Sequence, residues 1–304
     1  LAPMMGYTDC YFRSLIENIY GNRVLTFSEM IVDKAIIHNE IKTISKHFLE
    51  KNKSAIQIAG SDPQEIKRTI NILNQIDIIK HVNFNLGCPS SRVQENMLGL
   101  ALTQNYDLVK KCLFELINYK HEVSVKCRLG LGMNEDKNYI FSYLNLFKDI
   151  GIKKVFIHCR NGVLNLDTKK NRTIPQINYE LFLECSKKFP EMELIPNGEV
   201  NDLETFNSFK SKNINKYMIG RQFAKDALFL EKLKLEKIND KTSLVLDSIK
   251  ELDNYKYLNI NLLKKSLFTL INNISNSKGI KKDISIIDNT KDLLNYIERK
   301  IIWT

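Results

Sequence analysis

Cys88 is the residue of this sequence whose setting most clearly suggests chemistry. It stands in the segment Asn83–Ser90 (NFNLGCPS), on a glycine-proline loop that directly follows an apolar run. A thiol exposed on such a loop can act as a nucleophile or as an acid. The other five cysteines lie in apolar surroundings and form no C-x-x-C pair. We therefore expect them to be buried thiols in a reducing compartment.

A lysine and a histidine end two further strand-like runs. Lys126 lies in the alternating segment VSVKCR, and His158 follows the apolar run VFI. A lysine that points into the mouth of a barrel needs an anion, an electron-rich cofactor or a Schiff-base role. The alternatives are a lysine that snorkels at the end of a strand and a histidine satisfied within the core.

The elements that must position these side chains alternate between short apolar runs and longer amphipathic stretches. Eight β-α units within about 240 residues predict an α/β fold, a (β/α)8 TIM barrel. A doubly wound sheet is disfavoured because neither G-x-G-x-x-G nor G-x-x-x-x-G-K-[ST] occurs. The predicted strands are Leu1–Met4, Leu25–Met30, Ala55–Gly60, Val82–Gly87, Val123–Leu129, Lys154–Arg160, Glu193–Gly198 and Lys216–Arg221. The predicted helices between and after them are Asp9–Ile19, Val32–His38, Pro63–Gln75, Tyr106–Tyr119, Asn138–Ile150, Tyr179–Phe189, Asp202–Lys210 and Lys225–Leu235.

The pattern changes at about residue 241, where glycines and strand signals become rare. The segments Leu244–Leu252, Leu262–Ile274 and Asp292–Ile302 read as amphipathic helices. We therefore expect a catalytic barrel over residues 1–240 and a small all-helical domain over residues 241–304.

Barrel enzymes carry their active site at the carboxyl ends of the strands. Polar groups close seven of the eight predicted strands here, and the first ends in Pro3-Met4. The seventh and eighth strands end in Asn197-Gly198 and Gly220-Arg221. Backbone N–H groups at these two strands often bind phosphate, which glycine permits and arginine reinforces. A plain turn and a plain strand end are the alternative.

The charge of the chain favours an anionic partner. Lys and Arg number 45 and Asp and Glu number 35, a net charge of +10. Nucleic acid is the first candidate, although heavy use of Asn, Ile and Lys also fits AT-rich codons. Hydrophobic residues make up 43% and charged residues 26%, which is typical of a folded protein. No apolar run approaches 18 residues, so we expect no membrane span, and we expect no metal.

Several motifs, taken together, resemble those of the tRNA-dihydrouridine synthases, and most closely the A-type branch. The resemblance covers about residues 1–235 in order and spacing. Its segments are Ala2–Met4, Phe27–Met30, Ala35–His38, Gln57–Pro63, Asn83–Pro89 with Arg92–Gln94 and Gly99, Val125–Gly130, Ile157–Arg160, Pro196–Gly198 and Met218–Arg221. Glu199 departs from the family, which usually has Gly or Asp there.

The resemblance implies bound FMN, NADPH as reductant, and a D-loop uridine of tRNA as substrate, at position 20 or 20a. Cys88 would be the general acid for C5 after hydride reaches C6, and Asn85 would help to seat the uracil. The residues implied around the flavin ring are Ala2, Pro3, Met4, Gln57, Lys126 and His158. Those implied at its phosphate are Asn197, Gly198, the backbone of Glu199, Gly220 and Arg221. Those expected to contact tRNA are Arg92, Arg128, Arg160, Lys169, Lys170 and Arg172.

The acid role requires a thiol that is protonated before it reacts. Glycine and proline beside Cys88 place no cation next to it in the chain. We therefore expect a thiol that no adjacent charge forces to ionise.

Three other functions are open from the sequence. One is an FMN barrel that reduces a small molecule, and another is an aldolase-like barrel with Lys126 as Schiff base. The third is a tRNA-binding protein without catalysis. We expect a monomer in the cytoplasm; an organelle stays open because the sequence starts at Leu1 rather than at Met.

Overall fold

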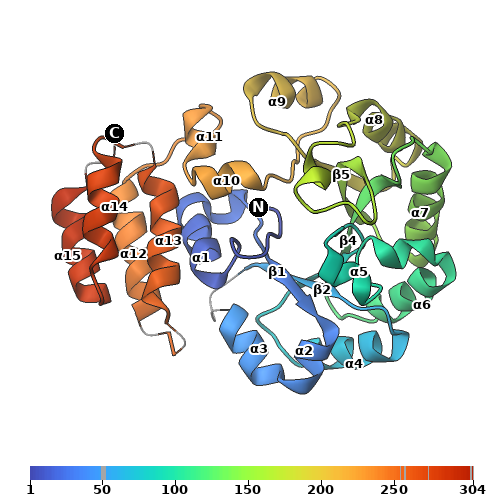
Figure 1. Ribbon diagram of the computed structural model, residues 1–304, viewed down its shortest axis with the longest axis horizontal. Coiled ribbons are helices and arrows are strands. Elements are labelled where there is room, and N and C mark those ends of the chain that lie inside the picture. Colours follow the sequence, from blue (N-terminus) through green and yellow to red (C-terminus); the bar gives the residue numbers. More distant parts are fainter. Residues whose placement is uncertain (49–52, 254, 257, 273, 302, 304) are drawn as a thin grey trace. The chain divides into compact units, whose positions relative to one another are not determined.

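The chain divides into two compact units, each described here by itself (Figure 1). The structure is a computed structural model that describes residues 1–48, 53–253, 255, 256, 258–272, 274–301 and 303. Unit 1 comprises Leu1–Glu29, Ile44–Ser54 and Gly220–Thr304. Unit 2 comprises Met30–Thr43 and Ala55–Ile219. The predicted boundary at residue 240 stays a prediction.

A parallel sheet forms the centre of unit 2. Its strands follow one another in chain order, and neighbouring strands from β2 to β6 pair in parallel. The strands are β1 (Phe27–Val32, which begins in unit 1), β2 (Ala55–Ala59), β3 (His81–Asn85), β4 (Glu122–Leu131), β5 (Lys154–Gly162) and β6 (Glu193–Asn197). Sequential parallel order with helical crossovers is the winding of a (β/α)8 barrel, so the predicted fold class is confirmed.

Helices fill the crossovers of unit 2 and cover the sheet (Figure 1). They are α2 (Asp33–His38), α3 (Glu40–His47, which ends in unit 1), α4 (Pro63–Leu73), α5 (Ser91–Glu95), α6 (Tyr106–Leu116), α7 (Lys137–Ile150), α8 (Tyr179–Lys188) and α9 (Leu203–Lys210), with the 3-10 turns η2 (Ala101–Gln104) and η3 (Lys170–Arg172). Asp62 and Asp202 cap the starts of α4 and α9, because Asp62 accepts from the backbone of Gln64 at 2.8 Å and Asp202 from that of Thr205 at 2.8 Å.

The first and eighth predicted strands do not form ladders in the described residues. Pro3 has no N–H to donate, and the N–H of Met4 bonds the Thr8 hydroxyl at 2.9 Å instead of a strand. The eighth segment is reduced to a single bridge between Asn197 and Met218. Two residues later Gly220 leaves the extended conformation and caps the next helix.

Helices build most of unit 1 (Figure 1). They are α1 (Cys10–Tyr20), η1 (Gly21–Arg23), α10 (Arg221–Lys225), α11 (Phe229–Lys232), α12 (Lys241–Asp253), α13 (Ile260–Ile271), α14 (Ser277–Ser285) and α15 (Thr290–Lys300). The three predicted C-terminal helices correspond to α12, α13 and α15, apart from Asn273 and Ile302, which lie outside the described residues. The sequence analysis missed α14, because its segment SKGIKKDIS buries only Ile280 and Ile284. Among the described helices, none has the length and apolarity needed to cross a membrane.

Asp33 is a buried acid at the start of α2, and its side chain is only half satisfied. It is 1% exposed, and one carboxylate oxygen accepts from the Lys34 N–H at 2.7 Å. The other oxygen has no hydrogen-bond partner among the described residues. Burial raises the pKa of Asp33 to about 6.

Asp33→Asn should therefore change the stability of the protein in a pH-dependent way. The pKa of Asp33 is higher in the folded protein than in the unfolded chain. Above pH 6 the ionised, buried carboxylate therefore destabilises the fold, whereas below about pH 4 the acid is protonated in both states and has no such effect. The free energy of unfolding of the variant, minus that of the parent, should rise by about 2–3 kcal/mol as the pH is raised from 4 to 8. Urea unfolding across that range measures the difference. The exposed control Asp288→Asn should show no such trend, and a flat profile for Asp33→Asn would contradict the buried acid.

Candidate active site

A chain of buried amides links three neighbouring strands of unit 2. Gln57 of β2 is 1% exposed, and its Nε2 donates to Oδ1 of Asn83 on β3 at 2.7 Å. Nδ2 of Asn83 donates to the hydroxyl of Ser124 on β4 at 2.8 Å. The same three residues are register partners across the sheet. Each buried polar group thus satisfies the next, and the register of β2, β3 and β4 is tied to these side chains.

Asn85 extends this chain of amides to the loop that carries the thiol. Its Nδ2 donates to Oε1 of Gln57 at 2.9 Å. Its Oδ1 accepts from the backbone N–H of Gly87 at 3.1 Å and of Cys88 at 3.0 Å. The position of the Cys88 backbone is therefore set by a side chain buried in the sheet. One of the two Asn85 amide hydrogens is left for a ligand.

Cys88 differs from the other cysteines as the sequence predicts. Its side chain is partly exposed, whereas the other five are buried. It packs against an apolar cluster that includes Ala59, Val93 and Leu98. Gly99 has φ +59°, and a Cβ there would lie 2.9 Å from the Cys88 carbonyl oxygen, so only glycine allows this close approach.

The other five cysteines are buried, as expected, and burial keeps their thiols protonated. It raises the pKa of Cys10 to about 11 and the pKa of Cys112, Cys127 and Cys185 to about 12. These thiols are protected from ionisation, in agreement with the role of small apolar side chains.

Two cations lie close enough to Cys88 to interact with its charge. Lys126 and Arg128 of β4 each interact electrostatically with Cys88. The expectation that no adjacent charge forces Cys88 to ionise stays a prediction. Register places Lys126 beside Asn85 across the β3–β4 ladder, which the local sequence does not reveal.

Lys126 is a partly buried ammonium without a carboxylate partner among the described residues. Burial lowers the pKa of Lys126 to about 8, and the neighbouring charge of Arg128 adds to this effect. Such a group gains from any anion or electron-rich ring that enters the site. This supports the predicted cofactor contact over the alternative of a lysine that snorkels into solvent.

His158 of β5 and Gly198, which directly follows β6, lie against each other. The predicted place of His158 at a strand end is wrong, because β5 continues to Gly162. His158 is paired in register with Asn197. Gly198 has φ +110°, and a Cβ there would lie 2.6 Å from Cδ2 and 2.9 Å from Nε2 of His158. Asn197 Nδ2 donates to the Met218 carbonyl at 2.7 Å, which holds the eighth segment beside β6. The close approach of backbone to ring therefore depends on glycine.

Arg160 and Glu199 form an ion pair next to this contact. The Arg160 side chain is 4% exposed and also donates to the Pro175 carbonyl. Its Nε has no hydrogen-bond partner among the described residues. Glu199 adopts φ +54°, the left-handed region that glycine prefers. The Arg160 guanidinium is engaged within the chain, and its predicted contact with tRNA stays a prediction.

The segment 163–174, called here the basic loop, is organised by a buried asparagine. Asn171 Nδ2 donates to the carbonyls of Val163 and Leu166, both at 2.8 Å. Its Oδ1 accepts from the Val163 N–H at 2.8 Å. Lys169, Lys170 and Arg172 are exposed on this loop, and Arg92 is exposed on α5. The loop thus presents cations on an ordered frame.

Arg128, which the resemblance predicts to contact tRNA, donates hydrogen bonds to several carbonyls of unit 2. Its Nε donates to the Gly87 carbonyl at 2.9 Å, and its Nη1 donates to the Asn161 and Asn171 carbonyls at 2.8 and 3.3 Å. The side chain is 5% exposed. Its predicted contact with tRNA stays a prediction, and its hydrogen bonds join the Cys88 loop to the basic loop.

The remaining predicted cofactor residues lie in unit 1, where they form a group of their own. A Cβ on Gly220 would lie 3.1 Å from Met4 Sδ and 3.4 Å from Ala2 Cβ. Pro3 lies between these two residues, and Arg221 is exposed at the start of α10. Within unit 1, the first segment and the last two residues of the eighth are thus neighbours, as barrel topology requires.

Sequence reasoning missed three residues that shape the site. Asn83 belongs to the buried chain of amides, Asn171 organises the basic loop, and Gln94 bonds two loops. Asn83 and Gln94 stand inside the recognised motifs, which was the available signal. Nothing in the local sequence distinguishes Asn171 from the other asparagines.

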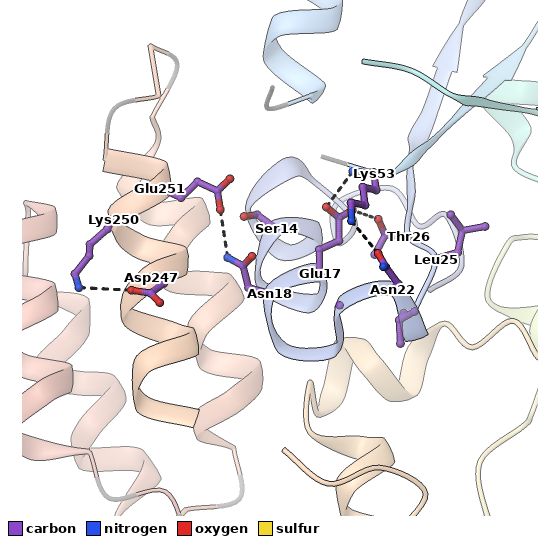
Figure 2. A pocket seen from close by; sticks show the side chains of 12 residues that line it. Ser14, Glu17, Asn18, Asn22, Leu25, Thr26, Lys53, Asp247, Lys250 and Glu251 are labelled. Carbon is purple, nitrogen blue, oxygen red and sulfur yellow. Dashed lines mark hydrogen bonds and ion pairs between the residues drawn. The ribbon is translucent and has the colours of Figure 1, made fainter. Parts of the chain in front are cut away.

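Unit 1 also contains a cavity of about 710 Å³ between α1 and α12 (Figure 2). Glu17, Asp247 and Glu251 contribute carboxylates to its lining, and Lys53 and Lys250 contribute ammonium groups. Figure 2 shows Lys250 paired with Asp247 at 3.5 Å. Because charges of both signs are mixed and locally paired, this cavity does not favour one class of ligand. No cluster of three potential metal-ligating side chains occurs in the part of the chain that the structure describes.

Comparison with known proteins finds a family that matches nearly the whole chain. A family model described as dihydrouridine synthase (Dus) matches residues 1–298. The tRNA-dihydrouridine(20/20a) synthase of Pseudomonas putida is 27% identical over 224 residues, which are 73% of this chain and 66% of that protein. The enzyme of the same name from Synechocystis sp. is 30% identical, with 73% and 66% covered. That of Yersinia pestis is 28% identical, with 83% and 73% covered. The chain thus spans about two thirds of the length of the first relatives it matches.

Among solved structures, morphinone reductase matches with a TM-score of 0.51 and 10% sequence identity. The match covers 79% of this chain and 86% of that one. At this level of identity the likeness supports the fold, and it carries no argument about ligands.

The Arg160–Glu199 pair generates a stability prediction. Glu199→Ala should cost about 2–3 kcal/mol of unfolding free energy, because it leaves a buried guanidinium without its carboxylate. Arg160→Met/Glu199→Ala should lose less than the two single variants together, which denaturant unfolding of the full cycle measures. In the exposed pair Lys137–Glu184, Glu184→Ala should cost less than about 1 kcal/mol. Strict additivity at Arg160 and Glu199 would show that the pair is uncoupled.

Proposed function

The chain belongs to the dihydrouridine synthase family, and on that premise we propose that it is an FMN-dependent tRNA-dihydrouridine synthase. Its substrate would be a D-loop uridine at position 20 or 20a, and NADPH would be the reductant. The observation that carries the proposal is the setting of Cys88: a partly exposed thiol, held by Asn85 and next to Lys126.

The reaction adds one hydride and one proton across the C5–C6 bond of uracil. When bound, FMN that NADPH has reduced supplies the hydride for C6. Cys88 Sγ–H holds the proton for C5, and the resulting thiolate regains a proton from solvent. The charges of Lys126 and Arg128 stabilise that thiolate until it is reprotonated.

The residues present fit a flavin with a phosphate tail. Lys126 offers an unpaired ammonium suited to electron density on the pyrimidine side of the ring. Gly198 turns directly after β6, the seventh predicted strand, where barrels often bind phosphate, and the ring of His158 lies against it. Ala2, Pro3, Met4, Gly220 and Arg221 stay predicted cofactor residues on the family resemblance alone.

Asn85 and Gln57 are proposed to orient the uracil and the ring beneath it. The remaining amide hydrogen of Asn85 can donate to a uracil carbonyl, because its other hydrogen already bonds Gln57. A base within folded tRNA has to be extruded to reach such a pocket. The exposed cations Arg92, Lys169, Lys170 and Arg172 are suited to hold the surrounding phosphates.

Cys88→Ala tests the chemistry. The purified variant should still bind FMN and oxidise NADPH, while dihydrouridine formation on tRNA should fall at least about 100-fold. Mass spectrometry of digested tRNA measures the product, and the flavin spectrum measures the cofactor. Cys185→Ala, which removes a buried thiol elsewhere, should retain activity. A parent protein that binds no flavin, or a Cys88→Ala variant with full product, would refute the proposal.

The basic loop generates a prediction about RNA affinity. Lys169→Ala/Lys170→Ala/Arg172→Ala should bind tRNA at least about ten-fold more weakly at 0.1 M salt. Its slope of log affinity against log salt should be smaller by about 2–3, roughly one unit per lost cation. Filter binding over a salt series gives both quantities.

A charge-matched control lies at the opposite edge of the same sheet. Lys80, Lys120 and Lys153 are exposed at the amino ends of β3, β4 and β5. Their combined replacement by Ala removes the same charge, and affinity should change little. Equal losses in the two triple variants would show that total charge, rather than the basic loop, binds RNA.

A further inference from the structure

The peptide carbonyls on both sides of Cys88 are held by side chains from elsewhere in unit 2. The Gly87 carbonyl accepts from Arg128 Nε at 2.9 Å. The Pro89 carbonyl accepts from Gln94 Nε2 at 2.7 Å. The backbone that carries the thiol is therefore fixed immediately before and after Cys88.

Both of these side chains also bond the polypeptide that follows Arg160 on β5. Arg128 Nη1 donates to the carbonyls of Asn161 at 2.8 Å and Asn171 at 3.3 Å. Gln94 Oε1 accepts from the N–H of Asn165 in the basic loop at 3.2 Å. One amide thus uses its donor for the Cys88 loop and its acceptor for the basic loop. A displacement of either loop has to strain or break a hydrogen bond of Gln94.

Hydrogen bonds within the basic loop tie its residues together, so a displacement of one part moves the rest. Asn171 bonds Val163 and Leu166 from within the loop, and it also accepts from Arg128. Asn165 itself has φ +64°, a conformation that asparagine tolerates and that its surroundings maintain. The cations Lys169, Lys170 and Arg172 lie on the same stretch of chain.

We propose that Gln94 is a positioning residue that couples RNA bound at the basic loop to the placement of the Cys88 thiol. The inference rests on the proposed function and adds to it a specific link between substrate binding and proton donation. Gln94 acts through Pro89 and Asn165, and it need not touch the reacting atoms. RNA that holds the basic loop in place thereby holds the Cys88 loop in place.

The experiment compares Gln94→Met and Gln94→Glu with the parent protein. Gln94→Met keeps the length of the side chain and removes both hydrogen bonds. Gln94→Glu keeps an acceptor for Asn165 and cannot donate to Pro89. Asn96→Ala is the matched control, since this neighbouring amide bonds only within its own turn, to the Arg92 carbonyl at 2.9 Å.

The rate of dihydrouridine formation is measured at saturating tRNA, together with the Kd for tRNA, flavin content and thermal stability. Gln94→Met should lower kcat at least ten-fold and change Kd less than three-fold, with flavin content and melting temperature close to the parent. Gln94→Glu should be intermediate, and Asn96→Ala should match the parent. Such a loss in kcat at constant Kd is what a purely structural role would not give.

Three results would overturn the inference. The first is an unchanged kcat in Gln94→Met, and the second is a loss confined to Kd. The third, which applies if Gln94→Met does not fold, is a Gln94→Glu variant that folds and has full kcat. A parent protein that binds flavin and tRNA but forms no dihydrouridine would overturn the proposed function itself, and this inference with it.

Discussion

The need to satisfy buried amides is the constraint on which the site depends. Gln57, Asn83 and Asn85 lie inside the sheet, and each supplies what the next lacks. Leaving one such group unpaired costs about 1–3 kcal/mol, so the three side chains and their strands are fixed together. Because the last acceptor, Asn85 Oδ1, bonds the backbone of Cys88, this constraint within the sheet also determines where the reactive thiol lies. The backbone of Cys88 is therefore positioned by a hydrogen bond from the sheet, although Cys88 itself lies in a loop.

The cationic side chains of unit 2 include two kinds: buried arginines bonded within the chain, and exposed lysines and arginines. The net charge of +10 suggests an anionic partner without telling which cations meet it. Arg128 and Arg160 are buried and bond carbonyls or a carboxylate of the chain itself. Lys169, Lys170 and Arg172 are exposed on a loop that Asn171 orders. Arg128 bonds the Asn171 carbonyl and so helps to position the basic loop, and the exposed cations are the ones proposed to meet RNA.

Much of the fold could be predicted because its signals are local. Alternation of apolar runs and amphipathic stretches gave the barrel class, and Asp62 and Asp202 mark helix starts by their own backbone contacts. The first and eighth strands were overestimated, because Pro3 and Gly220 are compatible with extended chain but not with a full ladder. Helix α14 was missed because two buried isoleucines give too weak a period. In each case the outcome depended on hydrogen bonds to distant partners.

The sequence by itself determined the barrel class, the family resemblance and the residue types at the site: an exposed thiol on a Gly-Pro loop, a lysine, a histidine, and a glycine at position 198. It predicted strand ends at Lys126 and His158, whereas β4 and β5 continue to Leu131 and Gly162. Only the tertiary structure decided what each of them adjoins. It placed Lys126 and Arg128 near Cys88, paired Arg160 with Glu199, and made Gln94 a bridge between two loops. The physical reason is that, apart from the bond of Gln94 to Pro89, these contacts join groups that lie tens of residues apart. Such partners leave no periodic or local trace in the chain.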